Sequence, residues 1–87
     1  MEAYKVMIVE DEYLMRDELA LFPWENNGFR LVGCAENGEV AWEMFQRLKP
    51  EIVLTDVMMP VMDGLELTRR ITTTNPGTVI IMLTCYS

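Results

Sequence analysis

The 87-residue sequence contains no histidine. Histidine is the commonest general base and the commonest metal ligand, so Ser-His-Asp catalysis, Cys-His catalysis and any phosphohistidine role are excluded within this chain. Two cysteines are too few for a disulfide framework. With only four prolines and 51% hydrophobic residues, the sequence is that of a folded chain rather than a disordered one.

Lysine and arginine are also scarce: 7 basic residues stand against 14 acidic ones, which gives a net charge of −7. An acidic domain repels phosphate backbones, so we expect no direct nucleic-acid binding and expect instead a cation or a basic partner surface. No apolar run approaches the roughly 18 residues of a membrane span, and the N-terminus lacks a basic-then-apolar signal pattern. We therefore expect no membrane contact and a cytoplasmic location.

Strand-like apolar runs alternate with helical patterns along the chain. The patterns predict strands at 4–9, 29–35, 52–55 and 78–83, and helices at 13–22, 39–49 and 65–72. In the first helix, Leu14, Met15, Leu19 and Phe22 are expected on one apolar side. This order predicts an α/β fold, with a parallel sheet and helices on both faces, in one domain covering 1–87.

The residues that leave each strand carry the chemistry, because ligands of open α/β sheets bind beyond the carboxyl ends of the strands. The first strand delivers Glu10, Asp11 and Glu12, the third delivers Asp56, and the fourth delivers Thr84. If the first and third strands are neighbours, Glu10 or Asp11 lies about 5 Å from Asp56.

Carboxylates at this spacing repel one another unless one takes a proton or a hard cation binds. Oxygen ligands without histidine or cysteine suit Mg²⁺ or Mn²⁺. Asp56 can also act as a nucleophile towards phosphorus, with the hydroxyl of Thr84 bonding a phosphoryl oxygen. The plainer alternatives are that residues 10–12 form a solvated helix start and that Asp56 is a turn residue. Asp63, followed by Gly64, is expected to serve a turn rather than a ligand site.

Three segments together resemble response-regulator receiver domains of two-component systems. Residues 7–12 (MIVEDE) resemble their acidic first strand end, residues 56–64 (DVMMPVMDG) their acceptor loop, and residues 81–84 (IMLT) their fourth strand with its switch hydroxyl. The resemblance covers essentially the whole chain. It implies a doubly wound, flavodoxin-like sheet with strand order 2-1-3-4.

The resemblance also implies a role for each site residue. Asp56 would be the phosphoacceptor, receiving its phosphoryl group from a sensor histidine kinase. Asp11 and Asp56 would hold Mg²⁺, the Met58 carbonyl would be a further ligand, and Glu10, where many members have Asp, would act through water. Thr84 would be the switch hydroxyl.

Residues 23–29 (PWENNGF), 36–38 (ENG) and 83–86 (LTCY) look like receivers attached to AraC-type DNA-binding domains, which implies a transcription output outside this chain. The family's fifth-strand lysine has no counterpart, since the only lysines are Lys5 and Lys49. We therefore expect an incomplete receiver that lacks the fifth strand and last helices. Its exposed apolar face should favour a homodimer or strand-exchanged oligomer.

A signalling receiver is not an enzyme; at most it catalyses its own phosphorylation and dephosphorylation. Two other functions are alternatives to this interpretation. A phosphatase with an aspartyl nucleophile needs a second acid two residues later, where this chain has Met58. A receiver-like interaction module without phosphotransfer is the remaining alternative.

Overall fold

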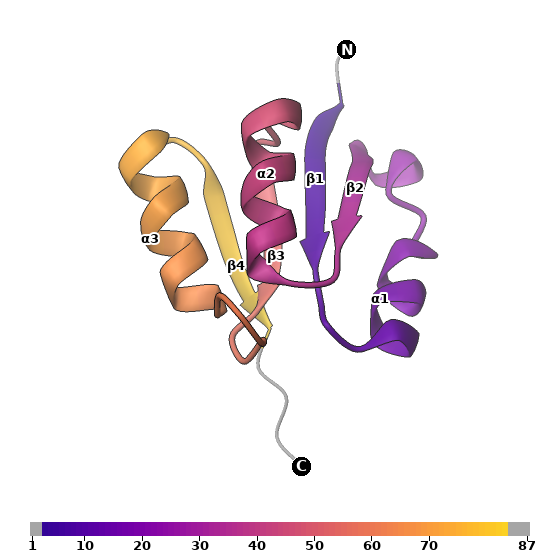
Figure 1. Ribbon diagram of the computed structural model, residues 1–87. Helices are drawn as coiled ribbons and strands as arrows, with labels where there is room; N and C mark the ends of the chain where they lie inside the picture. Colours follow the sequence, from indigo (N-terminus) through magenta and orange to yellow (C-terminus); the bar gives the residue numbers. More distant parts are fainter. Residues whose placement is uncertain (1–2, 84–87) are drawn as a thin grey trace.

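Residues 3–83, which the computed structural model describes, alternate between strands and helices as the apolar pattern predicts (Figure 1). All strand pairs are parallel, and the sheet order is β2-β1-β3-β4, which confirms the predicted doubly wound, flavodoxin-like arrangement. The elements are β1 (Tyr4–Val9), α1 (Tyr13–Ala20), the 3₁₀ helix η1 (Glu25–Asn27), β2 (Phe29–Ala35), α2 (Gly38–Leu48), β3 (Ile52–Asp56), α3 (Gly64–Thr74) and β4 (Val79–Leu83).

The central strand β1 is the most buried element, because it has a strand on each side and helices over both faces. Its residues 6–9 (VMIV) are at most 1% exposed. A run of consecutive apolar residues, rather than an alternating one, is what a parallel strand covered on both faces requires.

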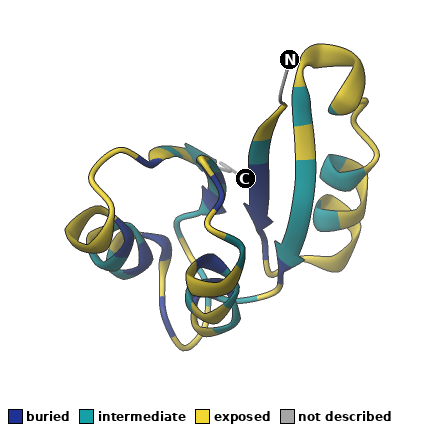
Figure 2. Cartoon of the chain, turned by 90° about the horizontal axis from the view of Figure 1, so that it is seen from above, coloured by how far each residue is buried: buried dark blue, intermediate teal, exposed yellow. Residues whose placement is uncertain are grey.

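Helices α2 and α3 cover one face of the sheet, and their apolar stripes form the main core (Figure 2). Its buried members are Met7, Val9, Ala35, Ala41, Phe45, Val53, Met62, Leu67 and Ile71. The helices contribute residues four apart, such as Ala41 with Phe45 and Leu67 with Ile71, because side chains at that spacing share one helix face.

Side-chain caps fix where these two helices begin. The Asn37 Oδ1 atom accepts the backbone N–H of Val40 at 2.8 Å, and the Asp63 Oδ1 atom accepts that of Glu66 at 2.9 Å. Each bond satisfies a helix N–H that has no partner within the helix. Both helices consequently start one residue before the predicted positions. Asp63, which was expected to serve a turn, is the N-cap of α3.

Helix α1 lies on the opposite face, beside β1 and β2, and differs from the prediction in two ways. It ends at Ala20 instead of residue 22, because the residue before Pro23 is disfavoured in a helix and the Trp24 indole N–H donates to the Leu19 carbonyl at 3.0 Å. Leu14 and Phe22 were wrongly placed on its apolar side: Leu14 is 68% exposed, and Phe22 lies beyond the end of the helix and is 48% exposed. No residue of α1 is buried (Figure 2).

Helix α1 covers only half of its sheet face. Along the row of paired residues Ile8, Leu54 and Ile81, exposure rises from 0% at Ile8 to 45% at Ile81. The β4 side of this face is therefore open. No helix formed by residues 3–83 has both the length and the apolar character needed to cross a membrane.

Candidate functional site

Three acids from two neighbouring strands meet at the carboxyl edge of the sheet. Asp56 is the last residue of β3, and Glu10 and Asp11 directly follow β1. Because Val9 pairs with Thr55 in the parallel register, the next residues of both strands emerge side by side. One carboxylate oxygen from each acid lies within 4.8 Å of the others.

Glu10 is the unusual member of this group, since it is only 6% exposed. Its N–H donates to the Ala35 carbonyl at 3.0 Å, and its own Oε2 atom accepts the Glu12 N–H at 3.1 Å. Burial raises the pKa of Glu10 to about 7; the Glu12 N–H opposes this shift, and the charge of Asp56 adds to it. A buried carboxylate beside like charges binds either a proton or a cation.

The loop after β3 folds back tightly against Asp56. The Met58 N–H approaches the Asp56 Oδ1 atom at 3.4 Å, and the Gly64 N–H donates to the Val57 carbonyl at 2.8 Å. A Cβ at position 64 would collide with the Asp56 carbonyl oxygen, so only glycine permits this approach. Val61 has φ 71°, an unusual conformation for a β-branched residue.

A hollow of about 290 Å³ opens beside the acids, towards the uncovered sheet face. Its lining residues are Glu10, Glu12, Met15, Leu19, Asp56, Met82 and Leu83. Glu10 and Asp56 therefore stand at the mouth of a largely apolar hollow, where a cation or a transferring group can reach Asp56 from solvent.

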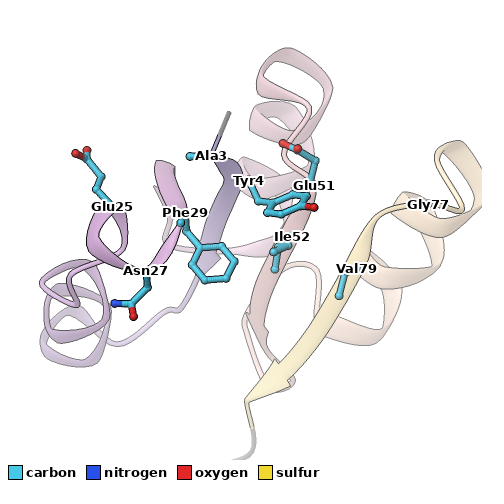
Figure 3. Close-up of a pocket in the computed structure, with 10 residues that line it drawn as sticks. Ala3, Tyr4, Glu25, Asn27, Phe29, Glu51, Ile52, Gly77 and Val79 are labelled. Atoms are coloured by element: carbon cyan, nitrogen blue, oxygen red, sulfur yellow. The ribbon is translucent and has the colours of Figure 1, made fainter. Parts of the chain in front are cut away.

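A larger hollow, of about 690 Å³, lies near the amino ends of the strands (Figure 3). Side chains of Tyr4, Phe29, Ile52 and Val79 line it, and it contains none of the three clustered acids. Parallel α/β sheets bind ligands at the other edge, so size alone does not make this hollow the functional one.

Of the predicted site residues, the structure brings Glu10, Asp11 and Asp56 together and places Met58 two residues along the acceptor loop. Thr84 lies outside the described residues. The sequence-based reasoning missed Arg16, whose Nη1 atom donates to the Glu10 carbonyl at 2.8 Å. Its only signal was a basic residue six positions after an acidic strand end.

Curated proteins with similar sequences include regulators and an enzyme. The uncharacterized transcriptional regulatory protein YesN of Bacillus subtilis (strain 168) is 40% identical over 84 residues, which are 95% of this chain and 23% of that protein. A protein-glutamate methylesterase/protein-glutamine glutaminase of Syntrophus aciditrophicus (strain SB) is 42% identical over 78 residues, which are 90% of this chain and 22% of that protein. The chain thus spans about a quarter of each relative or less.

Solved structures with a similar fold include domains of response regulators. The REC domain of AraT, a response regulator from Geobacillus stearothermophilus, has a TM-score of 0.88 at 31% identity, with 92% of this chain and 63% of that chain covered. A two component transcriptional regulator AraC from Clostridium phytofermentans ISDg has a TM-score of 0.86 at 35% identity, with coverages of 98% and 69%. The profile of the response regulator receiver domain matches residues 6–87. The chain therefore belongs to the response regulator receiver domain family of two-component systems.

Proposed function

We propose that this receiver domain accepts a phosphoryl group on Asp56 from the phosphohistidine of a sensor histidine kinase, in a reaction that requires Mg²⁺ or Mn²⁺. The observation that supports this proposal most is the convergence of Glu10, Asp11 and Asp56, with one carboxylate oxygen of each within 4.8 Å of the others. Such a cluster can both hold a divalent cation and present a nucleophilic carboxylate.

The donor set fits a hard cation, since it offers carboxylate oxygens and no nitrogen or sulfur. Asp11 and Asp56 would bind the ion directly, Glu10 would act through water, and the Met58 carbonyl would complete the protein's share. When bound, Mg²⁺ would neutralise the clustered carboxylates and offset charge on the transferring group. Mg²⁺ usually keeps several waters, which suits a partial protein shell.

In the transfer, a carboxylate oxygen of Asp56 attacks phosphorus in line with the leaving imidazole. The new O–P bond forms as the P–N bond of the donor breaks, and the imidazole keeps the electron pair and takes a proton from solvent. The product is an acyl phosphate on Asp56, which adds negative charge at the mouth of the hollow. Thr84 would then bond a phosphoryl oxygen and pass the change to the surface around β4.

We further propose that the phosphorylated domain controls a DNA-binding output domain outside this chain, in the cytoplasm. Two of the similar proteins are described as transcriptional regulators. Others are methylesterases, so the receiver by itself does not determine the output. The acidic charge of −7 supports an indirect route to DNA, through an attached or associated domain.

A small-molecule phosphodonor with Mg²⁺, followed by intact-mass measurement, tests the phosphoacceptor role. We expect one phosphoryl adduct that disappears in Asp56→Asn and when the metal is chelated. Asp63→Asn is the matched control: it lies in the same loop and keeps the helix cap, so it should still be phosphorylated.

Two results would refute phosphotransfer to Asp56. One is an adduct that survives Asp56→Asn. The other is the absence of an adduct on the wild-type chain when circular dichroism shows that the chain is folded. The second result, combined with no Mg²⁺ binding by calorimetry, would favour the interaction-module alternative.

A further inference from the structure

The turn between β1 and α1 carries two of the three clustered acids, so whatever fixes this turn also fixes the acids. The Glu10 N–H still belongs to the sheet, where it donates to the Ala35 carbonyl at 3.0 Å. The Glu10 carbonyl does not, since no backbone N–H within residues 3–83 donates to it. Its donor is instead the guanidinium of Arg16, at 2.8 Å.

Little else holds the start of α1 in place. Its N-cap residue, Glu12, makes no side-chain cap hydrogen bond. The other local bond, from the Glu12 N–H to the Glu10 Oε2 atom at 3.1 Å, uses a carboxylate that a cation would attract. The bond from Arg16 uses a main-chain oxygen, so it remains available whether or not the Glu10 carboxylate engages a cation.

Arg16 is bound through a main-chain oxygen and not through a carboxylate. Within the described part of the chain, its guanidinium forms no ion pair with an acid. It lies over the ring of Tyr13, with 5.7 Å from Cζ to the ring centroid. An arginine that paired with Glu10 or Asp11 would compete with a divalent cation, whereas this arrangement leaves the carboxylate oxygens free.

We propose that Arg16 is a positioning residue for the cation site: its bond to the Glu10 carbonyl fixes the β1–α1 turn, so that the Glu10 and Asp11 carboxylates converge on Asp56. The inference rests on the proposed function, because it assumes that these acids hold Mg²⁺. Arg16 acts through the backbone of Glu10 and touches neither the cation nor the phosphoryl group.

Charge and position make opposite predictions for the loss of Arg16. If its positive charge were its main influence on the site, removing it would relieve repulsion and tighten Mg²⁺ binding. If it positions the acids, removing it weakens binding despite the lost positive charge. Removal of groups that orient metal ligands typically costs about 10- to 100-fold in affinity.

The test is calorimetric titration of the chain with Mg²⁺, in the wild type and in Arg16→Met, which keeps the unbranched stem without donor or charge. We expect the Kd of Arg16→Met to rise about tenfold. Arg16→Lys, which keeps the charge and a donor, should recover part of the loss. Arg30→Met makes the same charge change at the amino end of the sheet, where Arg30 of β2 is in backbone register with Lys5 of β1. This variant should leave the Kd unchanged.

A second readout requires no metal. Amide hydrogen exchange of Asp11 and Glu12 in the metal-free protein should be faster in Arg16→Met than in the wild type, with exchange in β3 unchanged. If Arg16→Met does not give the wild-type circular dichroism spectrum, Arg16→Gln takes its place, with the same expected direction for both measurements.

An equal or lower Kd in the neutral variant, or no recovery in Arg16→Lys, would overturn the positioning role. That result is distinct from failure of the proposed function. If the wild-type chain itself does not bind Mg²⁺, the proposed function fails and the inference fails with it. If the wild type binds Mg²⁺ and the neutral variant binds it equally tightly, only the inference fails.

Discussion

The protonation of Glu10 is the electrostatic property of the site that an experiment can measure most readily. The residue is 6% exposed and its carboxyl stands beside two other acids, so its ionised form is unfavourable without a cation. Burial raises its pKa from 4.5 to about 7. Between these two values the folded protein holds a proton on Glu10 that the unfolded chain has released.

We therefore predict that the metal-free protein loses stability as pH rises from about 4.5 to about 7. The unfolded state binds fewer protons in this window, so the free energy of unfolding falls with pH, by up to about 3 kcal/mol. Urea unfolding at a series of pH values measures the effect, and Glu10→Gln should flatten it. Stability that rises across this window in the wild type would contradict the assignment.

The titration of Glu66 does not overlap the pH window in which Glu10 changes the stability. Its hydrogen bonds to Arg69 and then Arg70 lower its pKa to about 2. Its contribution is therefore lost only as pH falls from about 4.5 towards 2, below the window in which Glu10 acts.

Gly64 provides a steric test of the acceptor loop. A Cβ there would collide with the Asp56 carbonyl oxygen and crowd the Val57 backbone, which cannot move as a flexible side chain can. We predict that Gly64→Ala destabilises the fold by about 1–3 kcal/mol and slows phosphorylation of Asp56. Gly77→Ala is the control, because its Cβ would meet only the Asn75 Oδ1 atom, at 3.5 Å. Equal stabilities of the two variants would rule out a tight loop.

For single residues, the sequence predicted which acids meet but not which contacts position them. Glu10, Asp11 and Asp56 were identifiable because parallel strands end at one edge of a sheet. The role of Arg16 was not, since its reach back to the Glu10 carbonyl depends on the direction in which α1 leaves the turn. The burial of Glu10 likewise depends on packing that no local pattern encodes.

Among the elements, the helices that pack on the core were the most predictable. The apolar stripe of α2 has strong 3.6-residue periodicity, whereas α3 offered only one clear apolar pair and runs to Thr74, two residues beyond its predicted end. Each of the two helices begins at a capping side chain. The end of α1 was predicted two residues late, because the indole bond from Trp24 to the Leu19 carbonyl depends on tertiary structure. Leu14 fits a helical stripe in sequence, yet it faces solvent.

The cap of α2 gives a prediction at the scale of one element. Asn37→Ala removes the acceptor of the Val40 N–H and should lower the free energy of unfolding by about 1 kcal/mol. Asn37→Asp keeps an acceptor and should stay close to the wild type. Urea denaturation of the three proteins decides the matter, and an alanine variant as stable as the wild type would show that this bond contributes nothing.

For the whole molecule, alternation of strands and helices was enough to predict a parallel sheet, but it left the strand order open. The order 2-1-3-4 followed from resemblance to a family, since several orders obey the same handedness rule. The half-open sheet face also followed from that resemblance. The structure shows it directly at β4, where Val79 and Ile81 are 52% and 45% exposed.

This open face leads us to predict that the 87-residue chain self-associates as its concentration rises. Apolar residues and the edge of β4 are both exposed there, and either can pair with a second copy. Ile81→Glu should shift the chain towards monomer in analytical ultracentrifugation, whereas Leu14→Glu, on the solvent side of α1, should not. A wild-type chain that remains monomeric throughout the concentration series would contradict the prediction.

The proposed function requires that the acids after β1 share one divalent cation with Asp56. Anomalous diffraction from crystals soaked in Mn²⁺ tests it most directly. We expect a single strong peak at the carboxyl edge of the sheet, about 2 Å from carboxylate oxygens of both Asp11 and Asp56 and close to Glu10. A peak elsewhere, or one that contacts Asp11 without Asp56, would contradict it.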